Sequence, residues 1–204
     1  MEPKDKILKA SFELFSRYGI KSVTMDDIAK YLTMSKKTIY QYFRDKNEVV
    51  HQLMQKEIEH DIKDFSRIAT ESKNVVDEIF AHMKQMHQML ATINPNMFYD
   101  LKKYHPQSWG LFQQFKNDFI LGQVKTSLKR GVEQGLVRKD INIEVVSRLR
   151  MEEIDLGFNP EVYPYDKFRI IDVQLSLAEH FLYGVCTLKG HKLINKHRQI
   201  IEEE

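Results

Sequence analysis

Side chains suited to contacting nucleic acid are concentrated in residues 24–46, TMDDIAKYLTMSKKTIYQYFRDK. Lysine can donate to the acceptors of guanine, and glutamine can pair with adenine, so Lys36, Lys37 and Gln41 are predicted to contact bases. Hydroxyl groups and lysine also suit phosphate oxygens. The complete predicted DNA-binding set is Thr24, Ser35, Lys36, Lys37, Thr38, Tyr40, Gln41, Tyr42 and Lys46.

Two short helices joined by a tight turn are needed to position these side chains. Thr24, followed three residues later by Asp27, is typical of a capping box at a helix start. Ser35 is the next natural N-cap, which makes the preceding residues the turn. Ile39 and Phe43 are four residues apart and are expected to face inward, so the opposite face of the second helix is left for a partner. This arrangement offers one helix to a DNA major groove.

The segment resembles the DNA-binding domain of the TetR (tetracycline repressor) family of bacterial one-component regulators. Thr33 stands where the family usually has glycine. Because a β-branched residue is poorly suited to positive φ, the turn is expected to be strained or built differently. The matching residues are Phe12, Phe15, Gly19, Thr24, Ile28, Ala29, Ser35, Thr38, Ile39, Tyr40, Phe43 and Lys46.

Beyond Lys46 the apolar residues continue to recur at helical spacing, which predicts an all-α chain of about nine helices. The resemblance implies a helix-turn-helix DNA-binding domain at residues 1–47 and a helical effector-binding and dimerisation domain at residues 48–204. The helices expected after the first three begin near Asp45 and then cover approximately 75–93, 96–105, 107–134, 140–157 and 165–189. The tail from Gly190 is expected to be polar, ending in a solvated segment at 200–204.

Composition narrows the class of protein. No run approaches 18 apolar residues, so no membrane span is expected. The charged N-terminus lacks the apolar core of a signal peptide. A single cysteine, Cys186, precludes an intramolecular disulfide and suits a reducing cytoplasm, which is the expected location. Basic residues outnumber acidic ones in residues 1–47, whereas the remainder is slightly acidic, as expected if only the N-terminal part meets phosphate.

The resemblance also implies a homodimer formed by the last two long helices. The apolar residues of the last helix cover more of its surface than one core stripe needs, which predicts that a partner copy buries a second face. The predicted interface residues are Val173, Leu177, Phe181, Val185 and Leu188.

A pocket for a small hydrophobic inducer is expected in the body, since methionine and aromatic side chains form pliable apolar sites. The same residues at the same spacing also suit an ordinary helical core, and both interpretations stay open. The predicted lining residues are Met83, Met86, Phe98, Tyr104, Trp109, Phe112, Phe115 and Phe119.

Enzyme and metal chemistry find little support. His82 and His87 are five residues apart and His191 and His197 six apart, and neither spacing places both on one helix face for chelation. There is no phosphate-binding glycine loop and no nucleophile paired with a base, so no cofactor, metal or catalytic residue is expected. Redox sensing by Cys186 is an alternative to simple packing.

These observations predict a ligand-responsive transcriptional repressor that binds a palindromic, double-stranded operator as a homodimer and is released by an inducer. The alternative is a helical ligand-binding or scaffold protein whose N-terminal domain no longer binds DNA. Thr33 is the feature that favours this alternative.

Overall fold

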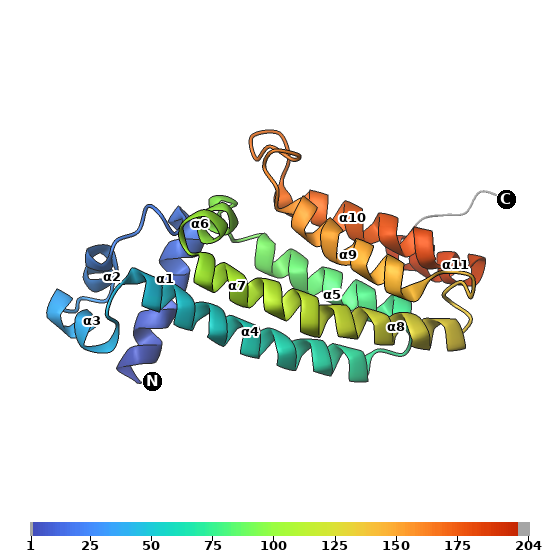
Figure 1. Cartoon of the computed structure of the whole chain (residues 1–204), viewed down its shortest axis with the longest axis horizontal. Helices are drawn as coiled ribbons and strands as arrows, with labels where there is room; N and C mark the ends of the chain where they lie inside the picture. Colours follow the sequence, from blue (N-terminus) through green and yellow to red (C-terminus); the bar gives the residue numbers. More distant parts are fainter. Residues whose placement is uncertain (1, 200–204) are drawn as a thin grey trace. The chain divides into compact units, whose positions relative to one another are not determined.

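The computed structural model describes residues 2–199, which are helical apart from connecting turns and one isolated bridge (Figure 1). The all-α prediction is confirmed. In chain order the elements are α1 (Pro3–Tyr18), α2 (Met25–Tyr31), α3 (Lys36–Tyr42), α4 (Lys46–Glu71), α5 (Val75–Leu90), α6 (Asn96–Tyr104), α7 (Pro106–Gln114), the π-helical segment η1 (Phe115–Ile120), α8 (Leu121–Glu133), α9 (Ile143–Gly157), α10 (Ile170–Val185) and α11 (Leu188–Arg198).

The described chain divides into two compact units. The head unit comprises residues 2–61 together with 92–114, and the body unit comprises residues 62–91 together with 115–199. The head unit therefore contains α6 and α7 as well as the first three helices. The functional division at residue 47 stays a prediction, but the compact unit around the N-terminal helices is larger than that.

Local sequence explains where the head helices begin and end. α1 has proline in its first turn and ends at Gly19, whose φ of 82° is costly for residues that carry a Cβ. Thr24 and Ser35 cap α2 and α3. Apolar side chains of α1 to α4, together with Leu101 of α6, form one buried core. The side chains that cap helices thus set the path of the chain, and the apolar ones hold the helices together.

The C-terminal part differs from the sequence prediction. The helix expected over 165–189 ends at Val185, because Cys186 adopts extended backbone and pairs with Val137 in an antiparallel bridge. Thr187 then accepts a hydrogen bond from the Gly190 N–H and caps α11. The polar segment predicted from Gly190 is thus helical as far as Arg198, and the sequence prediction did not include this helix. The solvated end predicted at 200–204 lies outside the described residues.

The predicted helix over 107–134 is present as α7, η1 and α8, which follow one another without a break. In η1 the helix is locally wider, a feature that inserts a residue into the α-helical ladder. The sequence periodicity did not distinguish this segment from α-helix.

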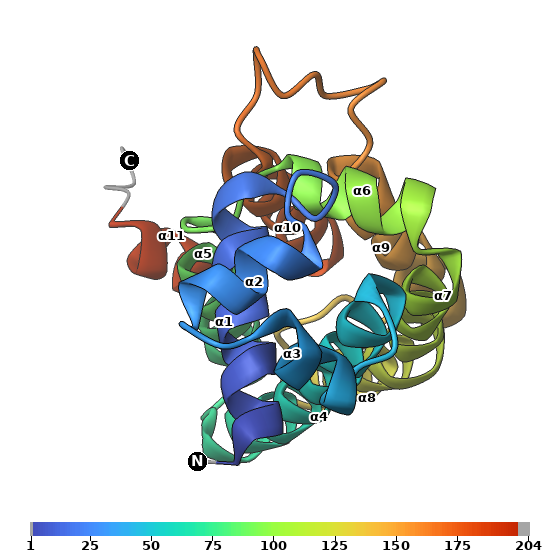
Figure 2. The ribbon, with the colours of Figure 1, turned by 90° about the vertical axis from the view of Figure 1, so that its left-hand side faces the viewer.

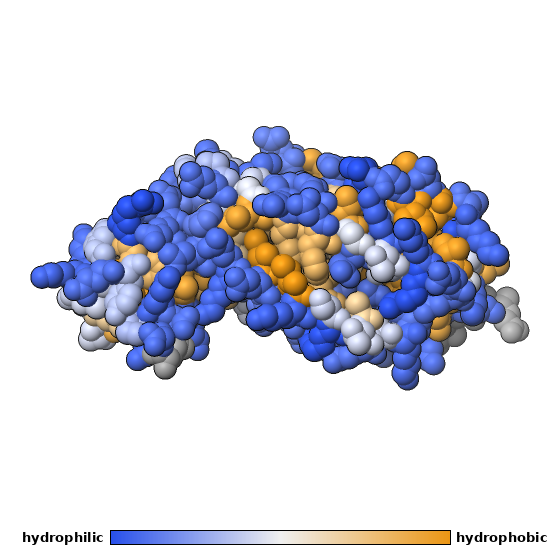
Figure 3. All heavy atoms as spheres, turned by 60° about the horizontal axis from the view of Figure 1, so that its bottom comes forward, coloured by the Kyte–Doolittle hydropathy of each residue, from blue (hydrophilic) through white to orange (hydrophobic). Residues whose placement is uncertain are grey.

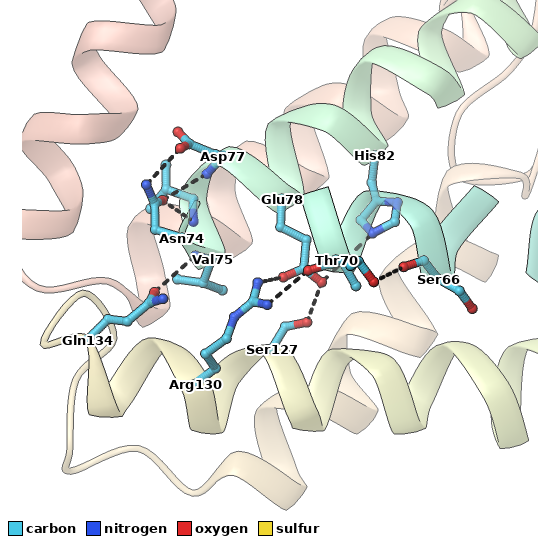
Figure 4. Close-up of polar contacts among 12 residues, drawn as sticks. Ser66, Thr70, Asn74, Val75, Asp77, Glu78, His82, Ser127, Arg130 and Gln134 are labelled. Carbon is cyan, nitrogen blue, oxygen red and sulfur yellow. Dashed lines mark hydrogen bonds and ion pairs between the residues drawn. The ribbon is translucent and has the colours of Figure 1, made fainter. Parts of the chain in front are cut away.

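A buried polar network joins three helices of the body unit (Figure 4). The Glu78 carboxylate of α5 is almost completely buried and pairs with the Arg130 guanidinium of α8. It also accepts a hydrogen bond from Ser127 Oγ at 2.7 Å. Arg130 Nη1 donates to the Ala69 carbonyl of α4 at 3.1 Å. A buried carboxylate needs such partners, so this network ties the end of α4 to α5 and α8.

Candidate nucleic-acid interface

The start of α2 is fixed by a reciprocal capping box. Thr24 Oγ1 accepts from the Asp27 N–H at 3.2 Å, and the Asp27 carboxylate accepts from the Thr24 N–H at 2.9 Å. The Thr24 hydroxyl also donates to Asp27 at 2.6 Å, and these hydrogen bonds lower the pKa of Asp27. Because the Thr24 O–H is already committed to Asp27, a phosphate contact from it requires this bond to open.

The turn between α2 and α3 has the geometry of a glycine turn although threonine occupies it. Thr33 has a φ of 54°, in the left-handed region. Its N–H donates to the Lys30 carbonyl, and the Met34 N–H donates to the Ala29 carbonyl. These two bonds form the Schellman closure, which normally has glycine at this position. The turn is thus strained and is built in the usual way.

α2 and α3 pack against each other, and α3 lies at the end of the head unit that faces the viewer in Figure 2. Ile28 and Ala29 of α2 are buried, as are Ile39 of α3 and Phe43 directly after it. The predicted inward face of the second helix is therefore observed. Figure 3 shows one face of the molecule, on which hydrophilic side chains predominate and apolar ones are exposed in patches.

The side chains predicted to read bases share the exposed face of α3. Lys36, Lys37, Tyr40 and Gln41 are all exposed. Lys36 Nζ forms an ion pair with Asp26 Oδ1 at 2.8 Å and lies 5.9 Å from the centre of the Tyr40 ring. Asp26 of α2 is therefore the partner, in this structure, of one of the lysines predicted to contact bases. No ion pair of Lys37 is found among the described residues.

Two hydroxyls at the start of α3 act together. Ser35 Oγ accepts from the Thr38 N–H at 3.0 Å, and the Ser35 and Thr38 hydroxyl oxygens are 2.8 Å apart. Whichever hydroxyl donates in this pair, the other keeps its proton for an external acceptor. The pair can thus offer one O–H to a phosphate oxygen while it still caps α3. Tyr42, at the end of the helix, is partly exposed.

Lys46 has a structural role that its sequence position did not reveal. Its ammonium group donates to the carbonyls of Ile20 and Val23, each at 2.9 Å, and to that of Lys21 at 3.5 Å. Burial lowers the pKa of Lys46. All three N–H donors point to the connection between α1 and α2, so the side chain is engaged within the head unit, and its contact with phosphate stays a prediction. At the start of α4 the Glu48 N–H already donates to Asp45 Oδ1 at 2.9 Å, so that carboxylate occupies the position of an anion at this helix end.

The predicted inducer-lining residues are divided between the two units. Met83, Met86, Phe115 and Phe119 belong to the body unit, whereas Phe98, Tyr104, Trp109 and Phe112 belong to the head unit. Phe115 stacks on Phe119 with ring centres 5.5 Å apart, and Met83 is part of the body core. Their role in ligand binding stays a prediction.

Two surface hollows in the described part of the chain are lined by other residues. A hollow of about 340 Å³ in the head unit is bordered by α1, Tyr31 and Thr92. Another of about 360 Å³ in the body unit lies beside Gln134 and Lys189. Neither contains any of the eight predicted lining residues.

Most of the predicted dimer-interface residues already have partners within one chain, and their role in a dimer stays a prediction. Val173, Phe181 and Val185 are buried within the body unit itself, where α10 packs against α5 and α9. Leu177 is partly buried, and Leu188 is 79% exposed at the start of α11. The apolar residues of α10 that exceed one core stripe therefore pack against other helices of the same chain. The prediction overlooked that both α5 and α9 cover this helix.

An exposed apolar stripe lies instead on α9. Val145, Leu149 and Leu156 are 59%, 52% and 38% exposed. Their spacing of four and seven residues places them on one side of the helix.

No group of three or more His, Cys, Asp and Glu residues in the described part of the chain is arranged to hold a metal ion. Cys186 is buried, and burial raises the pKa of its thiol to about 11, which disfavours the reactive thiolate. Among residues 2–199 no helix is long and apolar enough to cross a membrane.

Comparisons with known proteins agree with the geometry of the head. Residues 7–53 match the model of the bacterial regulatory proteins of the tetR family. The chain is 27% identical over 187 residues to the HTH-type transcriptional regulator YvaF of Bacillus subtilis, covering 88% of this chain and 94% of the relative.

Solved structures extend the likeness to the whole fold. The fatty acid degradation regulator FadR of Bacillus halodurans has a TM-score of 0.68 at 17% identity, covering 90% of this chain and 97% of that one. FadR of Bacillus subtilis in complex with stearoyl-CoA has a TM-score of 0.64 at 16% identity, covering 89% and 98%. At these identities the likeness concerns the fold alone.

Proposed function

This chain belongs to the TetR family of bacterial transcriptional regulators, and we propose that it is a repressor that binds a palindromic operator as a homodimer and is released by a small hydrophobic inducer. The observation that carries the proposal is the exposed face of α3. Lys36, Lys37, Tyr40 and Gln41 point outward while Ile39 is buried. A capped, well-packed helix with donors on its free side suits readout in the major groove.

Within this proposal the α3 residues have different roles. Lys37 and Gln41 are free to contact base edges, and Lys36 joins them once it leaves Asp26. The Ser35 and Thr38 hydroxyls, Tyr40 and Tyr42 contact phosphates and set the orientation of the helix. Thr24 contributes mainly as the N-cap of α2.

A palindromic operator requires two copies of the recognition helix roughly 34 Å apart, and thus a dimer. The α9 stripe of Val145, Leu149 and Leu156 is the surface we assign to the partner copy. Isolated exposed apolar residues are ordinary, but three on one face of a helix are typical of an interface. Replacing Leu149 with Glu should convert a dimer into a monomer in sedimentation velocity.

The inducer is proposed to be hydrophobic. One support is the abundance of methionine and aromatic side chains in α5 to η1. Another is that a protein of the same fold was solved with stearoyl-CoA bound. An inducer releases the protein from DNA by binding more tightly to the DNA-free protein than to the DNA-bound protein. The size of this effect is limited by the difference between the two affinities.

The alternative is a helical ligand-binding or scaffold protein whose head has lost DNA binding. Thr33 is the residue that favours this alternative, but the turn closes with both Schellman hydrogen bonds despite the threonine. A strained turn with intact geometry favours a functional head. Binding of the purified protein to the DNA upstream of its own gene, measured by fluorescence anisotropy, tests the choice. Binding confined to a palindrome supports the repressor, and no binding to any upstream fragment supports the alternative.

A further inference from the structure

The connection between α1 and α2, residues 19–24, carries buried backbone without regular secondary structure. Ile20 and Val23 are almost fully buried in the head core, and Gly19 has positive φ. Buried N–H and C=O groups need partners, and here helical hydrogen bonds cannot supply them. The connection ends at Thr24, the N-cap of α2, so its backbone path fixes where α2 begins.

Two charged side chains of opposite sign supply these partners. From α4, the Lys46 ammonium donates to the carbonyls of Ile20, Lys21 and Val23. From α6, Asp100 Oδ2 accepts from the Lys21 N–H at 2.7 Å. Asp100 is only 5% exposed, and the Lys46 charge interacts favourably with it. The Lys46 ammonium thus supplies donors to the carbonyls, and the Asp100 carboxylate supplies the acceptor for the Lys21 N–H.

The contact with Asp100 is unusually close. A Cβ on Gly19 would lie 3.2 Å from Asp100 Oδ2, so the carboxylate approaches the backbone where a side chain would crowd it. The next residue, Leu101, is buried in the same core as Ile20 and Ile28. α6 is therefore packed into the head unit by an apolar side chain and bonded to its backbone by a charged one.

We propose that Asp100 is a positioning residue for DNA binding: through the Lys21 amide it sets the backbone of residues 19–23, and through them Thr24, α2 and the recognition helix α3. α6 is thus part of the machinery that orients α3, although 58 residues separate Tyr42 from Asp100 in the sequence. The expected effect of Asp100 on DNA binding rests on the proposed function, whereas the hydrogen bond from the Lys21 N–H to Asp100 does not.

The bond itself is tested without DNA. Amide hydrogen exchange at Lys21 should accelerate at least about tenfold in Asp100→Ala, because a hydrogen bond to a charged acceptor is lost. Asp100→Asn keeps an acceptor oxygen and should give an intermediate rate. Unchanged exchange at Lys21 in Asp100→Ala overturns the inference.

The positioning role is tested on DNA with a control for general destabilisation. Leu53→Ala removes a buried side chain of α4 from the same core and leaves α6 and the carboxylate in place. At a temperature where all variants are fully folded, Asp100→Ala should weaken operator binding about tenfold, Asp100→Asn should recover part of this loss, and Leu53→Ala should stay within about twofold of the wild type. Equal weakening by Asp100→Ala and Leu53→Ala would show that Asp100 acts only through general stability, and would overturn the positioning role. If the wild type binds no operator, the proposed function fails, and the exchange rates still decide the bond.

Discussion

Lys36 Nζ lies 2.8 Å from Asp26 Oδ1, in an ion pair that joins the first turn of α3 to α2. The pair raises the pKa of Lys36 and holds its ammonium against α2. Both side chains are more than half exposed, so the pair can open when phosphates or bases compete for the lysine. Under the proposed function, Asp26 therefore competes with DNA for Lys36.

Replacing Asp26 with Asn should strengthen binding to DNA of any sequence several-fold at low salt. The freed Lys36 can neutralise about one more phosphate, and one negative charge near the DNA is removed. Titrating salt in an anisotropy assay should show a steeper slope by about 0.9 for each added contact. Asp172→Asn is the matched control, because it removes the same charge from an exposed ion pair in α10. An equal gain in both variants would contradict the competitor role.

Replacing Thr33 with Gly should stabilise the protein by about 0.5–1 kcal/mol, because relieving the strain of a β-branched residue in the left-handed region stabilises the folded state by more than the added chain entropy stabilises the unfolded state. The melting temperature should rise by a few degrees. Thr33→Ala, which keeps the Cβ, should gain less. A loss of stability in Thr33→Gly would show that the φ of 54° carries no strain.

Replacing Lys46 with Met should destabilise the head by about 1–3 kcal/mol, because the carbonyls of Ile20 and Val23 lose a charged donor. DNA affinity should fall by a similar factor on every sequence, as the whole of α2 and α3 loses its support. Urea unfolding and anisotropy measure the two effects. Lys63→Met, at an exposed position of the same helix, serves as control and should change neither.

Lowering the pH should reduce the free energy of unfolding of the body unit, because His82 is buried in its neutral form. Burial lowers the pKa of His82 to about 4, while its ring stacks on Phe65 at 4.2 Å. The unfolded chain therefore binds a proton near pH 6.5 that the folded chain does not, so stability is full above pH 6.5 and falls as the pH drops towards 4.

Between pH 7 and pH 5 the wild type should lose about 2 kcal/mol more unfolding free energy than His82→Asn. His87→Gln, which alters an exposed histidine of the same helix, should keep the wild-type loss. Parallel pH profiles for the wild type and His82→Asn would contradict the assignment.

Local signals accounted for most of the correct sequence predictions. The capping residues Thr24 and Ser35 and the inward pair Ile39 and Phe43 act within a few residues, so their pattern can be read directly. The same holds for Thr33, where a side chain alone indicates strain at positive φ.

The missed features depend on partners distant in sequence. Lys46 bonds to carbonyls 23 to 26 residues away, and Asp100 to an amide 79 residues away. Backbone carbonyls and amides are present at every position, so no residue type marks them as partners. Likewise α10 ends at Val185 because Cys186 pairs with Val137, which no local pattern around Cys186 indicates.

The salt dependence of DNA binding tests the central claim most directly. The affinity of the wild type for a palindrome from its own upstream DNA should fall with a log–log slope of about −0.9 per phosphate neutralised, or roughly −5 for six contacts shared by two heads. Lys37→Ala should reduce the discrimination between that palindrome and a scrambled sequence by about tenfold, as expected for loss of one base contact. A slope near zero, or discrimination unchanged in Lys37→Ala, would contradict the assignment of α3 as the DNA-reading helix.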